Sequence, residues 1–123
     1  MSFSGVSKEE ISPGTQQVRY VMSKYIEFTV KGYSMYPTYT PGETIVFDKI
    51  TEQNLKLLCE NDLIVFNHPF KENIKMFKRI KSLSEDSCFV SGDNPDPTSS
   101  FDSHNFGPIN KTNILAYKKE SFK

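Results

Sequence analysis

The sequence predicts an all-β fold, and three observations carry this prediction. About six short apolar segments are separated by turn residues, and several alternate apolar with polar side chains, as half-buried strands do. Strand patterns do not alternate with long helical patterns, so a βαβ organisation is not indicated. The length of 123 residues suits one domain with its own core. We therefore expect one compact all-β domain.

The expected elements begin after a polar lead-in. Residues 1–17 are polar and show no periodicity, so we interpret them as a flexible segment before a single domain at 18–123. Strands are then predicted at residues 26–30, 43–48, 62–67, 74–83, 87–90 and 113–118. A short helical turn is expected within 51–58, after a threonine that can cap it. Residues 92–108 are predicted to form a loop because Gly, Asp, Asn, Pro and Ser dominate there.

Composition excludes several classes of protein. The 15 basic and 15 acidic residues give a formal charge of zero, which argues against nucleic acid as the main partner. The longest strictly apolar run, residues 63–66, is far too short to span a bilayer, and the N-terminus shows no secretory signal. We expect a cytoplasmic protein without an integral membrane anchor. Nothing in the sequence indicates its oligomeric state.

Cysteine and histidine are too sparse and too scattered to predict a metal centre. Cys59 and Cys88 lie far apart and form no Cys-x-x-Cys pair, so we interpret both as buried, reduced thiols. His68 and His104 show no spacing to each other or to the cysteines that is typical of zinc ligands. We expect neither a metal nor a cofactor.

The first candidate for chemistry is Ser34, in a turn directly after a predicted strand. Gly32 allows the backbone to turn sharply, and Pro37 fixes its own φ and favours an extended residue before it. Ser34 thus lies at a stiff corner, which suits a nucleophile. The Gly-x-Ser-x-Gly elbow of the α/β-hydrolases is excluded because position 36 is Tyr. Taken alone, the segment fits an ordinary turn serine equally well.

The second candidate is Lys78, within a predicted strand. Strand alternation places Met76 and Ile80 beside it on the same face, and this apolar setting would lower the pKa of its ammonium. A neighbouring like charge, Arg79, would act in the same direction. A lone lysine with this pattern more commonly lays its stem on the sheet and keeps its charged end in water.

The third candidate is a polar loop after the strand at 87–90. It begins with Gly92-Asp93-Asn94 and continues to Ser100-x-Asp102-Ser103. Asp and Asn side chains bond to nearby backbone amides, so the segment is typical of turns. Its many short polar side chains could also position another residue.

Taken in this order, the three segments resemble the signal peptidase I superfamily of serine–lysine peptidases, over about residues 30–116. Within that superfamily the chain most resembles the nickel-type superoxide dismutase maturation proteases, which carry the short sequence motifs seen here at Gly92–Pro95 and Phe106–Pro108. The resemblance implies the fold of compact, coiled antiparallel sheets that signal peptidases share with the SOS-repressor proteases.

The resemblance also implies a role for each candidate. Ser34 would be the nucleophile and neutral Lys78 its general base. The backbone N–H of Ser34 would stabilise the oxyanion. The turn residues that would support it there are Gly32, Met35 and Pro37. The loop residues that would support the dyad are Gly92, Asp93, Asn94, Ser100 and Asp102, with Ser100 orienting the lysine amine.

Three departures from the superfamily pattern affect this loop and its surroundings. His104 stands where Arg is usual, so an ion pair with Asp102 would titrate near neutral pH, and Arg79 is an alternative partner. The loop is about two residues longer than usual, which makes Ser99 a rival to Ser100. Asn61 replaces an expected glycine, and Asn tolerates the left-handed backbone that a glycine there implies.

The function that the resemblance implies is removal of an N-terminal extension from a precursor of nickel superoxide dismutase, bound as an extended strand. Nickel would then belong to the substrate. Processing of another leader peptide is an alternative, as is a non-catalytic β-domain that binds an extended peptide. Self-cleavage is less favoured, because the chain contains neither the Ala-Gly nor the Cys-Gly dipeptide at which SOS repressors are cut.

Overall fold

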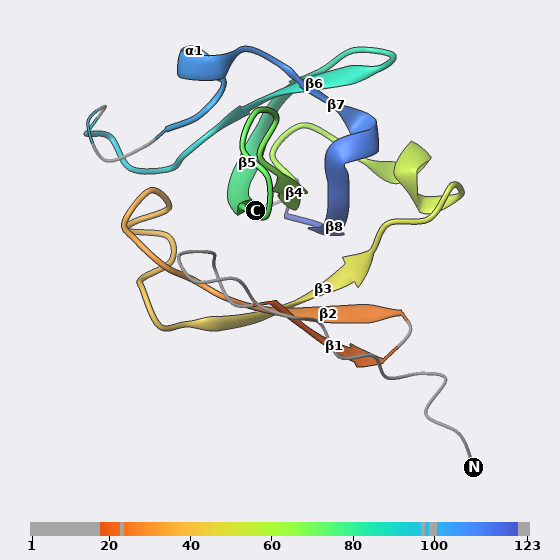
Figure 1. Ribbon diagram of the computed structural model, residues 1–123, viewed down its shortest axis with the longest axis horizontal. Helices are drawn as coiled ribbons and strands as arrows, with labels where there is room; N and C mark the ends of the chain where they lie inside the picture. Colours follow the sequence, from red (N-terminus) through yellow and green to blue (C-terminus); the bar gives the residue numbers. More distant parts are fainter. Residues whose placement is uncertain (1–17, 23, 97, 99–100, 121–123) are drawn as a thin grey trace.

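One antiparallel sheet organises the chain in the computed structural model, which describes residues 18–22, 24–96, 98 and 101–120 (Figure 1). Its eight strands lie in the order β1-β2-β3-β8-β4-β5-β6-β7, and each pair of neighbours is antiparallel. The strands are β1 (Val18–Met22), β2 (Tyr25–Thr29), β3 (Thr44–Lys49), β4 (Leu63–Asn67), β5 (Lys75–Leu83), β6 (Ser87–Ser91), β7 (Ile109–Asn110) and β8 (Ile114–Lys118). The predicted all-β fold is confirmed.

The described helices are single turns. They are η1 (Asn54–Leu57), α1 (Ser103–Phe106) and η3 (Lys111–Asn113). The expected helical turn within 51–58 is therefore confirmed as η1. In the part of the chain that the structure describes, no helix has the length and apolar character needed to cross a membrane.

Two apolar cores pack against opposite faces of β4 and β5. The first core lies toward β2 and β3, where Phe28, Phe47 and Phe77 meet edge to face at centroid distances of 5.4–6.0 Å. The second core lies toward β6 and β7 and includes Ile64 and Ile80. Because both faces of β4 are covered, its residues 63–66 are all fully buried, which explains their uninterrupted apolar run.

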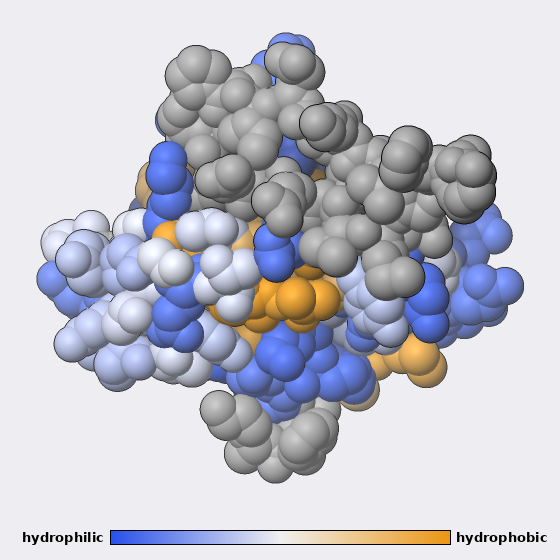
Figure 2. All heavy atoms as spheres, turned by 90° about the horizontal axis from the view of Figure 1, so that it is seen from below, coloured by the Kyte–Doolittle hydropathy of each residue, from blue (hydrophilic) through white to orange (hydrophobic). Residues whose placement is uncertain are grey.

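The outer face of β3 is more polar than its inner face. Ile45 and Phe47 are buried against the first core, whereas Thr44 and Val46 are exposed on the other side of the strand. In the view from below, the side of β1 to β3, the coloured residues are mostly hydrophilic or intermediate, with hydrophobic side chains near the centre and at the lower right (Figure 2). The strand expected at residues 43–48 is therefore confirmed as β3, and its side chains alternate between the two faces.

Several details differ from the sequence prediction. β1 and β7 were not predicted as strands, and α1 lies within the expected loop at 92–108. Cys59 is exposed, so the prediction that both thiols are buried was wrong. Cys88 is buried and reduced as expected, and burial raises the pKa of its thiol to about 11. The predicted lead-in, 1–17, lies outside the described residues.

Candidate active site

Ser34 lies in the turn that connects β2 to β3. Gly32 has a φ of +76°, in the left-handed region that favours glycine, which confirms the expected sharp turn. Two backbone hydrogen bonds close the turn, from Tyr36 N–H to the Tyr33 carbonyl at 3.0 Å and from Tyr39 N–H to the Met35 carbonyl at 2.9 Å. A corner with this many internal bonds holds a side chain in one place.

The turn is anchored by one side chain and exposes others. Met35 is buried in the first core, whereas Ser34 is half-buried. The rings of Tyr33 and Tyr36 are both exposed and contact each other edge to face at 5.9 Å. The peptide bond before Pro37 is cis. Ser34 is thus carried on an anchored turn that reaches the surface.

Lys78 is buried in the middle of β5. Its side chain is only 3% exposed, and it shares a face with Met76 and Ile80, which belong to the second core or pack against it. Burial lowers its pKa to about 8, and the negative charge of Asp102 acts in the opposite direction. The alternative of a lysine with its charged end in water is therefore wrong, and an amine with this pKa can accept a proton near neutral pH.

The loop after β6 joins the Ser34 turn to the strand of Lys78. Asn94 donates its backbone N–H to the Ser34 carbonyl at 2.9 Å and its side-chain amide to the Tyr33 carbonyl at 2.8 Å. One residue earlier, Asp93 accepts two hydrogen bonds from the Arg79 guanidinium, at 2.9 and 2.7 Å. The three segments selected from the sequence therefore come together.

Asp102 caps α1 and faces the same loop. Its carboxylate accepts the Gly92 N–H at 2.9 Å and two contacts from His104, the backbone N–H at 3.0 Å and ring Nδ1 at 2.8 Å. Burial acts to raise the pKa of Asp102, but these hydrogen bonds from Gly92 and His104 outweigh it and lower the pKa. Asp102 is thus held as a carboxylate whose charge acts on Lys78.

The structure decides two of the three departures noted in the sequence. His104 does pair with Asp102, whereas Arg79 pairs with Asp93, so the prediction of Arg79 as a substitute partner for Asp102 was wrong. Asn61 has a φ of +78°, as expected for a residue that replaces glycine. Ser99 and Ser100 lie outside the described residues, so the serine that orients Lys78 stays a prediction.

A group of contacts near the C-terminus was missed by the sequence reasoning. The Tyr39 hydroxyl donates to Glu120 at 2.8 Å, and the Arg79 guanidinium lies 3.8 Å from the same carboxylate. Asp62, which is fully buried, accepts the Glu120 N–H at 3.1 Å and the Lys119 ammonium at 2.8 Å. These partners are far apart in sequence, and no pattern in a single chain pairs them.

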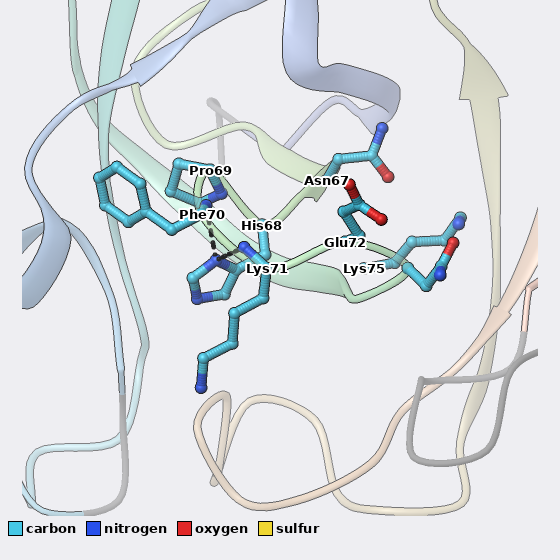
Figure 3. Close-up of a pocket in the computed structure, with 8 residues that line it drawn as sticks. Asn67, His68, Pro69, Phe70, Lys71, Glu72 and Lys75 are labelled. Atoms are coloured by element: carbon cyan, nitrogen blue, oxygen red, sulfur yellow. Dashed lines mark hydrogen bonds between the residues drawn. The ribbon is translucent and has the colours of Figure 1, made fainter.

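Two hollows lie near these elements. One, of about 330 Å³, lies against the 92–95 loop and includes Asp102 and His104 in its lining. The other, of about 630 Å³, lies on the β4–β5 hairpin, where His68 Nδ1 accepts the backbone N–H groups of Phe70 and Lys71 (Figure 3). Among the described residues, none that was predicted as catalytic or supporting lines this second hollow.

Comparison with known proteins adds a family to this geometry. A family model described as "Signal peptidase, peptidase S26" matches residues 17–84, more than half of the chain. The chain belongs to the signal peptidase S26 family. It is therefore a signal-peptidase-like serine peptidase. The matched residues include Ser34 and Lys78, whereas the 92–104 loop lies beyond them. No curated protein sequence matches the chain.

Proposed function

We propose that the protein is an endopeptidase in which Ser34 is the nucleophile and Lys78 its general base. The observation that carries this proposal is the setting of Lys78. A buried lysine with a lowered pKa lies on the strand to which the Ser34 turn is tied through Asn94, Asp93 and Arg79. A purely structural lysine gains nothing from such burial, which costs free energy while the amine is charged.

The reaction follows from the two side chains. Neutral Lys78 takes the proton of the Ser34 hydroxyl as its Oγ attacks the scissile carbonyl. The backbone N–H of Ser34 donates to the oxyanion, on the turn that Gly32, Met35 and Pro37 shape. The Lys78 ammonium then protonates the leaving amine. Water, deprotonated by the same lysine, hydrolyses the ester on Ser34.

An extended substrate would find beside Lys78 a strand edge with which no described strand pairs. β6 pairs with β5 only from Arg79 onward, and β4 covers the opposite edge. Residues 75–78 of β5 therefore have no neighbouring strand on the β6 side among the described residues. A peptide that adds itself to this edge would gain backbone hydrogen bonds next to the general base.

We propose a precursor of nickel superoxide dismutase as the substrate, cleaved in the cytoplasm at the end of its N-terminal extension. This substrate assignment is supported by the resemblance of Gly92–Pro95 and Phe106–Pro108 to the corresponding sequence motifs of the dismutase maturation proteases. Another leader peptide would use the same edge and the same dyad.

Intact-mass analysis of a co-expressed dismutase precursor tests this proposal. We expect trimming with the wild-type protein, none with Ser34→Ala or Lys78→Ala, and normal trimming with Lys81→Ala, a matched control for an exposed lysine of the same strand. Trimming that survives Ser34→Ala would contradict the serine mechanism. A precursor that stays intact with wild-type protein would contradict the substrate assignment, and a panel of other leader peptides would then distinguish a different substrate from a binding role.

A further inference from the structure

We propose that Glu120 is a positioning residue for the candidate active site, which it serves by holding Tyr39 and through it the turn that carries Ser34. This inference rests on the proposed function, because a position matters for catalysis only if Ser34 is the nucleophile. It concerns a residue outside all three segments selected from the sequence and outside the region that the family model matches.

Tyr39 closes the Ser34 turn at its C-terminal side. Its backbone N–H bonds to the Met35 carbonyl at 2.9 Å, and its ring packs edge to face on Phe77 at 5.5 Å, next to Lys78 in the chain. Its hydroxyl donates to Glu120 Oε2 at 2.8 Å. Burial and this hydrogen bond raise the pKa of Tyr39, so the phenol stays a donor. The far end of the turn is thus held by a carboxylate.

The backbone of Glu120 is fixed without its side chain. Its N–H donates to Asp62 Oδ1 at 3.1 Å, and the preceding Lys119 ammonium contacts Asp62 Oδ2 at 2.8 Å. Asp62 is fully buried and also accepts the Cys59 N–H at 2.9 Å. Removal of the Glu120 carboxylate should therefore leave the C-terminal segment in place, which separates positioning from anchoring.

Two sets of contacts hold the Ser34 turn, and both include the Glu120 side chain. Arg79 lies 3.8 Å from Glu120 Oε1 and is bonded to Asp93, whose neighbour Asn94 bonds to the Ser34 carbonyl. Arg79 also directly follows Lys78 in β5. Glu120 is only 8% exposed, so water and salt screen its contacts little. The Glu120 carboxylate therefore contacts both Tyr39, which closes the Ser34 turn, and Arg79, which follows Lys78 in β5.

The test compares Glu120→Ala, Glu120→Gln and a matched control, Lys119→Ala. The control loses the adjacent contact to Asp62 but not the contact to Tyr39. Amide hydrogen exchange by NMR, well below the unfolding temperature, reads the Tyr39 N–H without any substrate. We expect exchange about tenfold faster in Glu120→Ala, since a hydrogen bond to a charged group has that order of effect. Glu120→Gln, which keeps an acceptor, should restore most of the protection. Lys119→Ala, which keeps the bond from the Glu120 N–H to Asp62, should change the exchange far less than Glu120→Ala does.

Kinetics on a cleaved peptide gives the second measurement. We expect Glu120→Ala to lower kcat with little change in KM or in the pH at which the rate rises, and Glu120→Gln to recover most of kcat. Unchanged Tyr39 exchange in Glu120→Ala, or equal loss in Lys119→Ala, would overturn the inference. Faster exchange with an unchanged kcat would overturn it too, because the contact would then hold the turn without serving catalysis. Cleavage that does not depend on Ser34 would instead overturn the proposed function. The exchange experiment uses no substrate and does not test that function.

Discussion

Burial of the Lys78 amine lowers the stability of the folded protein. The pKa of this amine is about 8 in the folded protein and about 10.4 in an unfolded chain, a difference equivalent to about 3 kcal/mol. Below pH 8 the amine is charged in both states and the full cost applies. Between these two values only the unfolded chain holds the proton, so stability should rise with pH across this window. A residue kept at such a cost is consistent with a catalytic role.

Replacement of this lysine by an apolar side chain of similar length should stabilise the protein. We expect Lys78→Met to raise the free energy of unfolding by about 1–3 kcal/mol at pH 7, because no charge is then buried. The gain should shrink as the pH approaches about 10.4. Urea unfolding at several pH values measures it, with Lys81→Met as the exposed control. Lower stability of Lys78→Met at pH 7, or a gain independent of pH, would contradict the pKa assigned to Lys78.

At the scale of elements, the turn of Ser34 and the loop after β6 act as one unit. The side-chain amide of Asn94 supplies one of the two bonds between them, to the Tyr33 carbonyl. Asn94→Ala removes this bond and also the acceptor of the Asp96 N–H, while the backbone bond to Ser34 stays. It should therefore lower kcat roughly threefold to tenfold. Steady-state kinetics and a melting curve check this, with Asn67→Ala as an exposed control. An unchanged kcat would show that the backbone bond alone positions the turn.

The sequence predicted those elements whose residues alternate or cluster locally. Strand alternation correctly placed Lys78 on one face with Met76 and Ile80. Short apolar segments bounded by turn residues located β2 to β6 and β8 to within a few residues. β1 and β7 have no such pattern, because one is partly polar and the other has only two residues. The helix α1 was missed because its cap, Asp102, also suits a loop.

Contacts between distant residues set the limit of prediction at the site. The ion pair of Arg79 with Asp93 and the hydrogen bond of Tyr39 with Glu120 depend on how strands fold over each other. Alternation indicates which face a side chain takes but not what lies across from it. The alternative of Arg79 as the partner of Asp102 was therefore wrong, and Glu120 was not predicted at all.

At the scale of the molecule, β4 belongs to both cores. Leu63 and Val65 lie in the first core, and Ile64 and Phe66 lie in the second. Neither core can lose its packing without exposing the other, so residues 18–120 should unfold in one transition. That the chain forms a single domain stays a prediction, which this experiment tests. Far-ultraviolet circular dichroism and tyrosine fluorescence should give coincident urea curves, and two separate transitions would contradict it.

Titration of the Lys78 side chain tests the proposed dyad most directly. Carbon-13 NMR of lysine Cε, with the Lys78→Met spectrum to assign the signal, gives its pKa in the intact protein. We expect a midpoint near pH 8 and a rise of kcat/KM through the same pH, because only the neutral amine can take the proton of Ser34. A midpoint at about 10.4, the value of an exposed lysine, or a kcat/KM that stays flat from about pH 5 to 9, would contradict Lys78 as the general base.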